Sequence, residues 1–100
     1  MEMTIQQEGN EIKIKISGRM DTITTRECEQ RLTPLWTQPA PHLVIDCSEL
    51  SYVSSAGLRL FLVMQKQTTA LKGSLRLVGM QPMIRETFNL TGFGILFHIE

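Results

Sequence analysis

The clearest pattern in the chain is a strict alternation of apolar and polar residues near its N-terminus. Residues 11–17 place isoleucines on one side and lysines on the other, which is typical of a strand with one buried face. A shorter strand is predicted at residues 3–5, and Gly9-Asn10 between the two favours a tight hairpin turn. The chain is therefore expected to begin with a β-hairpin.

The next pattern predicts a helix over residues 24–37. Thr24 and Glu27 have the spacing of a capping box, in which two side chains satisfy free amides of the first helical turn. Pro39 and Pro41 prevent the helix from continuing. The apolar residues at helical spacing, which form one stripe able to pack on a sheet, are Cys28, Leu32, Leu35 and Trp36.

The middle of the chain predicts the core strand of the sheet and the longest helix. Residues 42–47 form a short apolar run of the kind found in a central strand covered on both faces. Residues 48–53 are interpreted as a loop. The helix is expected to begin at Ser54 or Ser55 and to end near Leu71, because Gly73 is a natural stop.

The last third of the chain predicts two more strands around one helix. Residues 74–78 alternate as a strand, and Pro82 suits the first turn of a helix that buries Ile84 and Phe88 and stops at Gly92. A final strand is expected at residues 95–97. The order β-β-α-β-α-β-α-β indicates an α/β fold, with a mixed sheet and parallel βαβ units whose crossovers need helical cover.

Length and composition limit the classes of function. One hundred residues predict a single domain, residues 1–100, and 42% hydrophobic residues suffice for a packed core. Ten basic residues balance ten acidic ones, so the sequence lacks the positive field expected of a direct nucleic-acid binder. We see no leader sequence and no apolar stretch long enough for membrane insertion, and we expect a cytoplasmic protein.

The residues that most often carry chemistry are few and scattered. Cys28 and Cys47 lack metal-ligand spacing and are interpreted as reduced, partly buried thiols. His42 and His98 have no helical partner and are expected to be ordinary strand-end residues. Glycine-rich nucleotide motifs are absent, so we predict no metal, no cofactor and no catalytic residues, and hence a binding protein rather than an enzyme.

The junction between the predicted core strand and the longest helix is the most informative place in the sequence. Binding groups in α/β sheets generally lie beyond the carboxyl ends of the strands, where Ser54 and Ser55 stand. Spacing alone favours an N-capping role for these serines. The segment also matches the second half of G-x-S-x-G, the motif around the nucleophile of many serine hydrolases. The first glycine of that motif is absent, and so are the acid and the histidine that should follow in the sequence.

Residues 46–59 resemble the sequence motif of STAS domains, especially bacterial anti-sigma factor antagonists. In that family a strand ending in D-x-S-x-[LV] leads to D/S-S-x-G-L, and the serine two places before the Gly-Leu pair accepts a phosphate. That serine corresponds to Ser55. Residues 18–21 also resemble the family's G-x-x-D, and residues 88–93 its F-x-x-[ST]-G-[LF], so the resemblance covers nearly the whole chain.

The resemblance implies a phosphorylation-regulated switch in a single STAS-type domain. The unphosphorylated domain would bind an anti-sigma factor that is also a serine kinase of the GHKL type, phosphorylation of Ser55 would release it, and a PP2C-like phosphatase would restore binding. Asp21 would support partner contact or phosphorylation, with a turn or helix-start role as the alternative. The partner-binding residues implied are Asp21, Ser54, Ser55, Gly57 and Leu58.

The chain departs from the family pattern in three places. Ser54 stands where many phosphorylated members carry Asp, which makes it a rival phosphorylation site, and Ala56 stands where many carry a second hydroxyl residue. The family also commonly ends in a further helix, for which no residues follow Glu100. Two other hypotheses follow: a non-phosphorylated STAS accessory subunit of a lipid-transport ATP-binding complex, and a small serine hydrolase acting through Ser55.

Overall fold

The computed structural model describes residues 1–100, which form five strands, three α-helices and two short 3₁₀ helices. The element order agrees with the predicted β-β-α-β-α-β-α-β order. The elements are β1 (Glu2–Glu8), β2 (Glu11–Met20), α1 (Thr22–Leu32), η1 (Thr33–Thr37), β3 (His42–Val53), α2 (Ser55–Ala70), β4 (Ser74–Val78), α3 (Pro82–Leu90), η2 (Phe93–Ile95) and β5 (His98–Ile99).

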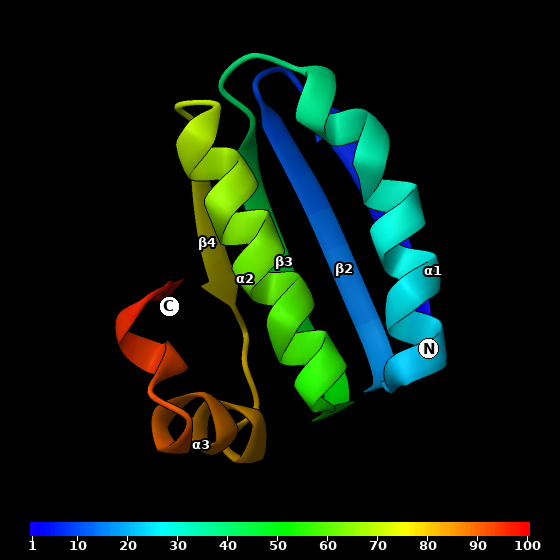
Figure 1. The fold of residues 1–100 in the computed structure, drawn as a ribbon, viewed down its shortest axis with the longest axis vertical. Helices are drawn as coiled ribbons and strands as arrows, with labels where there is room; N and C mark the ends of the chain where they lie inside the picture. Colours follow the sequence, from blue (N-terminus) through cyan, green and yellow to red (C-terminus); the bar gives the residue numbers. More distant parts are fainter.

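The strands form one mixed sheet in the spatial order β1-β2-β3-β4-β5. β1 runs antiparallel to β2, as expected of the N-terminal hairpin, and the other neighbours are parallel. Figure 1 shows α1 and α2 side by side on one face of the sheet, with α3 near the end of the sheet where α2 begins. The predicted α/β class with a mixed sheet is confirmed.

Helices cover only one face of the sheet, so the central strand, predicted to be covered on both faces, has helical cover on one of them only. Ile14 and Ile16 of β2 are fully buried beneath the helices, whereas Lys13 and Lys15 point to the open face and are exposed. Val44 of β3 is buried but lies outside the main apolar core. The open face therefore carries polar residues in place of a second helical layer.

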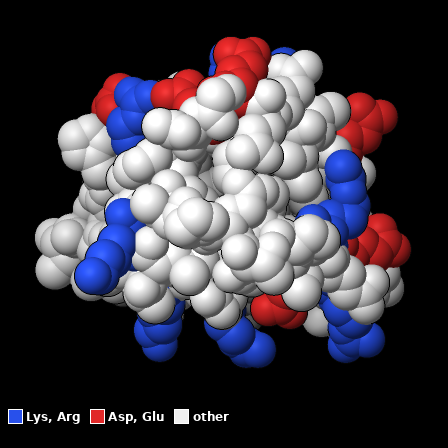
Figure 2. All heavy atoms as spheres, turned by 90° about the horizontal axis from the view of Figure 1, so that it is seen from above, with Lys and Arg blue, Asp and Glu red and all other residues white.

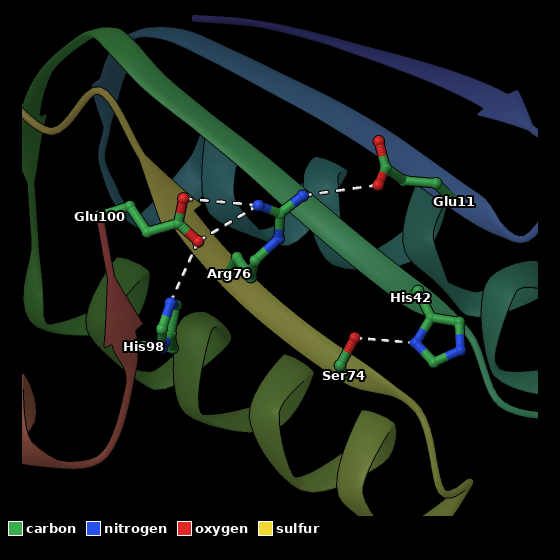
Figure 3. A network of polar contacts seen from close by, with 6 residues as sticks. All are labelled: Glu11, His42, Ser74, Arg76, His98 and Glu100. Carbon is green, nitrogen blue, oxygen red and sulfur yellow. Dashed lines mark hydrogen bonds and ion pairs between the residues drawn. The ribbon is translucent and has the colours of Figure 1, made fainter.

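Charged side chains cover part of this open face. Arg76 of β4 extends across β3, and its guanidinium lies 3.5 Å from Glu11 on β2 and 3.2 Å from Glu100 after β5 (Figure 3). Val44 is the partner of Arg76 in the sheet, so the two side chains are neighbours on the open face. The methylene groups of such a side chain can shield apolar surface while the charge stays in water, which accounts for the burial of Val44.

An aromatic cluster joins α2, α3 and the C-terminal segment. Phe61, Phe88 and Phe97 are buried, and their rings meet edge to face with centroids 5.4 to 6.4 Å apart. Edge-to-face pairs place the positive ring edge against the negative ring face of a neighbour. The packing of α3 and β5 on the rest of the domain therefore depends on these three rings.

The first helix differs from its prediction at both ends. It begins at Thr22 with Asp21 as its N-cap, and Thr24 is the third helical residue rather than the cap. The α-helix ends at Leu32 and gives way to η1, because Pro34 has no backbone N–H to donate to the carbonyl four residues before it. An α-helix followed by a 3₁₀ helix thus replaces the single helix predicted over residues 24–37.

Residues 48–53, predicted as a loop, continue β3 and pair with the end of β2. Two shifts in register, between Lys15 and Ser17 and between Gly18 and Arg19, interrupt the pairing. Leu50 and Val53 are the buried residues of this stretch, and with Cys47 just before it they give the burial pattern a spacing of three. The bulges interrupt the two-residue alternation of buried and exposed side chains, so the sequence pattern that identifies a strand is lost here.

The predicted final strand at residues 95–97 is also wrong. Ile95 ends η2 and is 91% exposed, whereas Phe97 is buried in the aromatic cluster. β5 begins one residue later, at His98, and pairs with Arg76 and Leu77 of β4. No helix of the structure combines the length and the apolar character that crossing a bilayer would require.

We predict that Phe88→Ala destabilises the domain by about 3–5 kcal/mol, because it removes a fully buried ring and leaves a cavity in the aromatic cluster. Urea denaturation followed by circular dichroism measures the loss. Leu90→Ala is the matched control on the same helix, since Leu90 is 80% exposed, and it should change stability by less than about 0.5 kcal/mol. Equal losses in both variants would contradict the assigned core.

Candidate functional site

The candidate site lies where β2 and β3 end and the two covering helices begin. Met20 ends β2 and is followed by Asp21, the N-cap of α1, while Val53 ends β3 and is followed by Ser54, the N-cap of α2. The carbonyl oxygen of Met20 accepts a hydrogen bond of 2.9 Å from the amide of Ser54. This bond brings the starts of both helices to the same edge of the sheet.

Asp21 holds the first turn of α1. Its Oδ1 accepts hydrogen bonds from the backbone amide and the hydroxyl of Thr24, each 2.9 Å long, and the Thr24 hydroxyl oxygen accepts from the amide of Asp21. These bonds favour the charged carboxylate and lower the pKa of Asp21 from its ordinary value. Asp21 thus has a definite helix-start role, which was one of the two roles considered for it.

The two serines have different environments. The hydroxyl oxygen of Ser54 accepts a hydrogen bond of 3.2 Å from the amide of Gly57, so Ser54 is the cap of α2. Ser55 is the first helical residue, is exposed, and makes no side-chain hydrogen bond within the chain. One hydroxyl therefore stabilises the helix start, and the other faces solvent.

Gly57 and Leu58 lie beneath this surface. A Cβ atom at Gly57 would come within 2.9 Å of Val53 Cγ1 and 3.2 Å of the Met20 side chain, both closer than ordinary contacts. Leu58 is packed in the main core. Both residues thus hold the start of α2 against the strand ends, and any effect that they have on a partner would pass through the position of Ser55.

Two exposed apolar side chains flank the site, and sequence reasoning missed both. Ile23, in the first turn of α1, is 73% exposed, and Tyr52, near the end of β3, is 39% exposed. The guanidinium of Arg19 lies 4.2 Å from the centre of the Tyr52 ring, which is a cation–π distance. Tyr52 stood in a segment interpreted as a loop, and Ile23 lay before the predicted helix start, so neither had a periodic signal.

The remaining candidate groups lie elsewhere. His42 begins β3, at the opposite end of that strand from Ser55, and its Nδ1 lies 2.8 Å from Ser74 Oγ; His98 Nε2 lies 3.0 Å from Glu100 (Figure 3). Neither histidine can therefore serve Ser55 as a base. No group of three or more His, Cys, Asp or Glu side chains is arranged to hold a metal ion.

The interpretation of the cysteines as free thiols is confirmed, and both are fully rather than partly buried. Cys28 and Cys47 are free and buried under the helices. Burial disfavours the thiolate and raises the pKa of Cys47 to about 12, and it raises the pKa of Cys28 in the same direction. Both thiols are therefore core residues with little nucleophilic character.

Known proteins show the same architecture and related sequences. The anti-sigma-B factor antagonist of Staphylococcus aureus is 29% identical over 88 residues, which are 88% of this chain and 82% of that protein. BtrV of Bordetella bronchiseptica is 28% identical over 99 residues, which cover 99% of this chain and 85% of BtrV.

Among solved structures, the unphosphorylated anti-sigma factor antagonist SpoIIAA superposes with a TM-score of 0.84 at 19% identity and covers 99% of this chain and 88% of its own. An anti-sigma factor antagonist from Mycobacterium paratuberculosis superposes with a TM-score of 0.85 at 23% identity, over 98% of this chain and 83% of its own. These likenesses establish the fold. The family model for the STAS domain matches residues 2–100, and the chain therefore belongs to the STAS domain family.

Proposed function

We propose that this chain is an anti-sigma factor antagonist, a protein-binding switch that associates with an anti-sigma factor and is released by phosphorylation of Ser55. The relatives named above carry that function in their names. The observation that carries the proposal is the exposed, unbonded hydroxyl of Ser55 at the first residue of α2. A kinase can reach this group without breaking a hydrogen bond of the fold.

The partners proposed are a GHKL-type serine kinase that is itself the anti-sigma factor, and a PP2C-like phosphatase that removes the phosphate. We expect these encounters in the cytoplasm. The exposed Ile23, in the first turn of α1, and Tyr52, near the end of β3, suit a docked protein, because contact with it would remove their apolar surface from water. Their placement gives the phosphoacceptor the character of an interface residue.

Phosphate on Ser55 is compatible with the fold. It adds about −1.5 to −2 charges at a helix N-terminus, where the helix dipole and free amides favour negative charge. Ser54 supplies the cap, so phosphorylation of Ser55 leaves the hydrogen bond from the Gly57 amide to the Ser54 hydroxyl oxygen intact. Phosphorylation of Ser54 would instead disturb that bond, which favours Ser55 over its rival.

The same charge is costly to a docked partner. Two like unit charges about 4 Å apart repel by about 4 kcal/mol at an effective dielectric constant of 20, which corresponds to about a thousandfold in affinity. A carboxylate of the partner within that range would suffice. The switch therefore requires no rearrangement of the STAS domain itself.

We expect incubation with the cognate kinase and ATP to add one phosphate to the chain, and Ser55→Ala to abolish this addition. Intact-mass spectrometry followed by peptide mapping measures the outcome. Ser54→Asp is the matched control, because Asp keeps an N-capping acceptor and should leave labelling at Ser55 unchanged. Labelling that persists in Ser55→Ala would contradict the assignment.

We expect Ser55→Glu to weaken binding of the anti-sigma factor by up to about a thousandfold, because its carboxylate stands where the phosphate would stand. Calorimetry measures the affinity, and circular dichroism should show an unchanged fold. Thr69→Glu places the same charge on the exposed surface at the other end of α2 and should bind as the native chain does. Undiminished binding by Ser55→Glu would rule out the charge switch.

Asp21→Ser separates helix capping from partner contact, because serine keeps a capping oxygen but lacks the charge. Since folding lowers the pKa of Asp21, its contribution to stability is present above the ordinary Asp pKa of about 3.9 and is lost as the pH falls through the lowered value. The melting temperature of the native chain should therefore fall more steeply below about pH 4 than that of Asp21→Ser.

If Asp21 also contacts the partner, Asp21→Ser should weaken binding at neutral pH, while the melting temperature there falls only by the lost contribution of the charge. Asp21→Ala, which lacks the capping oxygen, should lower the melting temperature as well. Native affinity in both variants would restrict Asp21 to its helix-start role.

A further inference from the structure

Helices α1 and α2 enclose a groove that begins beside Ser55. Its volume is about 130 Å³, the space of about four water molecules, which suits the end of one polar side chain. The groove is lined mainly by polar side chains, together with Ala56, the residue that follows Ser55. The residues concerned are Thr22, Thr25, Arg26 and Glu29 from α1, and Ala56 and Arg59 from α2. Both helices thus present side chains to one small volume.

The positive charges of this groove are unpaired. Arg26 and Arg59 face it from different helices, and neither has a carboxylate within 4.0 Å. Glu29 is the one acidic residue in the lining, so the arginines outnumber it. Figure 2, viewed from the end of the molecule where α2 finishes, shows several basic groups projecting along its lower rim, on the side of the helices. A negatively charged group would therefore be favoured here.

A buried hydroxyl in the same lining also lacks a partner. Thr25 is 6% exposed, and its Oγ1 makes no hydrogen bond. Four threonines nearer helix C-termini donate their hydroxyl protons to the carbonyl oxygen four residues before them; they are Thr33, Thr68, Thr87 and Thr91. A buried hydroxyl without a partner is rare in native proteins. The oxygen atom is itself buried, so Thr25 leaves an unpaired hydroxyl beneath the surface of the groove.

We propose that this groove binds an acidic side chain of the docked partner protein, an inference that rests on the proposed function. Arg26 and Arg59 can both donate, and an ionised carboxylate only accepts, so the two sets are complementary. The fork of N–H groups on a guanidinium also matches a carboxylate in geometry. The groove would fix the partner's orientation beside Ser55.

Ser55 itself could supply a competing anion. Arg59 follows Ser55 by four residues, the spacing at which side chains meet on a helix surface. A phosphate on Ser55 would therefore lie within reach of Arg59 and compete with the partner's carboxylate. The test must distinguish the partner's acidic group from a negative charge on this chain.

The native chain, labelled with ¹⁵N, is titrated with N-acetylglutamate amide against sodium chloride of equal ionic strength. The resonances observed are the side-chain Nε–Hε groups of Arg26 and Arg59 and the amides around Thr25. We expect saturable shifts at these positions, and a binding constant weakened about tenfold in Arg59→Gln, since a charge-assisted hydrogen bond is lost. Shifts that stay linear, or that match those in sodium chloride, overturn the site.

Lys66→Gln is the matched control, because it removes an exposed positive charge from the same helix without altering the groove lining. It should titrate as the native chain does, and an equal loss in both variants would reduce the effect to overall charge. Ser55→Glu tests the other source of the anion. If the Arg59 resonance is already fully shifted in that variant, while the native chain shows no saturable shift, the groove serves this chain's own negative group and the partner assignment is overturned.

The titration needs neither kinase nor ATP. A failure of Ser55 labelling would leave a positive titration intact, and a negative titration would leave the phosphorylation result intact. The two proposals therefore fail separately.

Discussion

The close approach of α2 to the ends of β2 and β3 is the constraint on which the site depends. Gly57 permits it, since a Cβ atom there would press on Val53 and Met20. The hydrogen bond from the Ser54 amide to the Met20 carbonyl fixes the same junction from the backbone side. With α2 held in this way, Ser55 becomes the first side chain of the helix that points away from the sheet.

The division of labour between neighbouring serines follows from this geometry. An N-cap side chain accepts a hydrogen bond from one of the first helical amides, whereas the side chain of the next residue makes no capping bond. Ser54 thus contributes to the stability of α2, and Ser55 carries no structural bond that chemistry would have to break. A modification at the second position can change the surface while the helix start below it persists.

Much of the architecture follows from residue patterns, and the exceptions have physical causes. The alternation at residues 11–17, with lysines on the outer side, already indicated a strand with one open face, yet the apolar run at residues 42–47 suggested two covered faces. Val44 is buried beside its sheet neighbour Arg76, whose side chain crosses β3, and no local pattern reveals a neighbour so distant in sequence. Likewise, bulges in the β2–β3 pairing removed the alternation at residues 48–53.

The site shows a similar division. The position of Ser54 and Ser55 at a strand–helix junction was predictable from spacing, and the importance of Ser55 came from the family resemblance. Which serine caps the helix depends on backbone geometry that residue types do not determine, because either hydroxyl could accept the bond. Ile23, Tyr52 and the groove between α1 and α2 arise only when separate elements come together.

The two register shifts between β2 and β3 have a consequence for tolerance to change in chain length. They direct Leu50 and Val53 into the core at a spacing of three residues, and they let Met20 and Val53 pair at the end of the strands. Removal of one residue from this stretch would turn the following side chains to the other face of the sheet and pull the two helix starts out of alignment. Insertions and deletions should therefore be far better accommodated in the hairpin turn at Gly9-Asn10, at the other end of the strands, than in this irregular stretch.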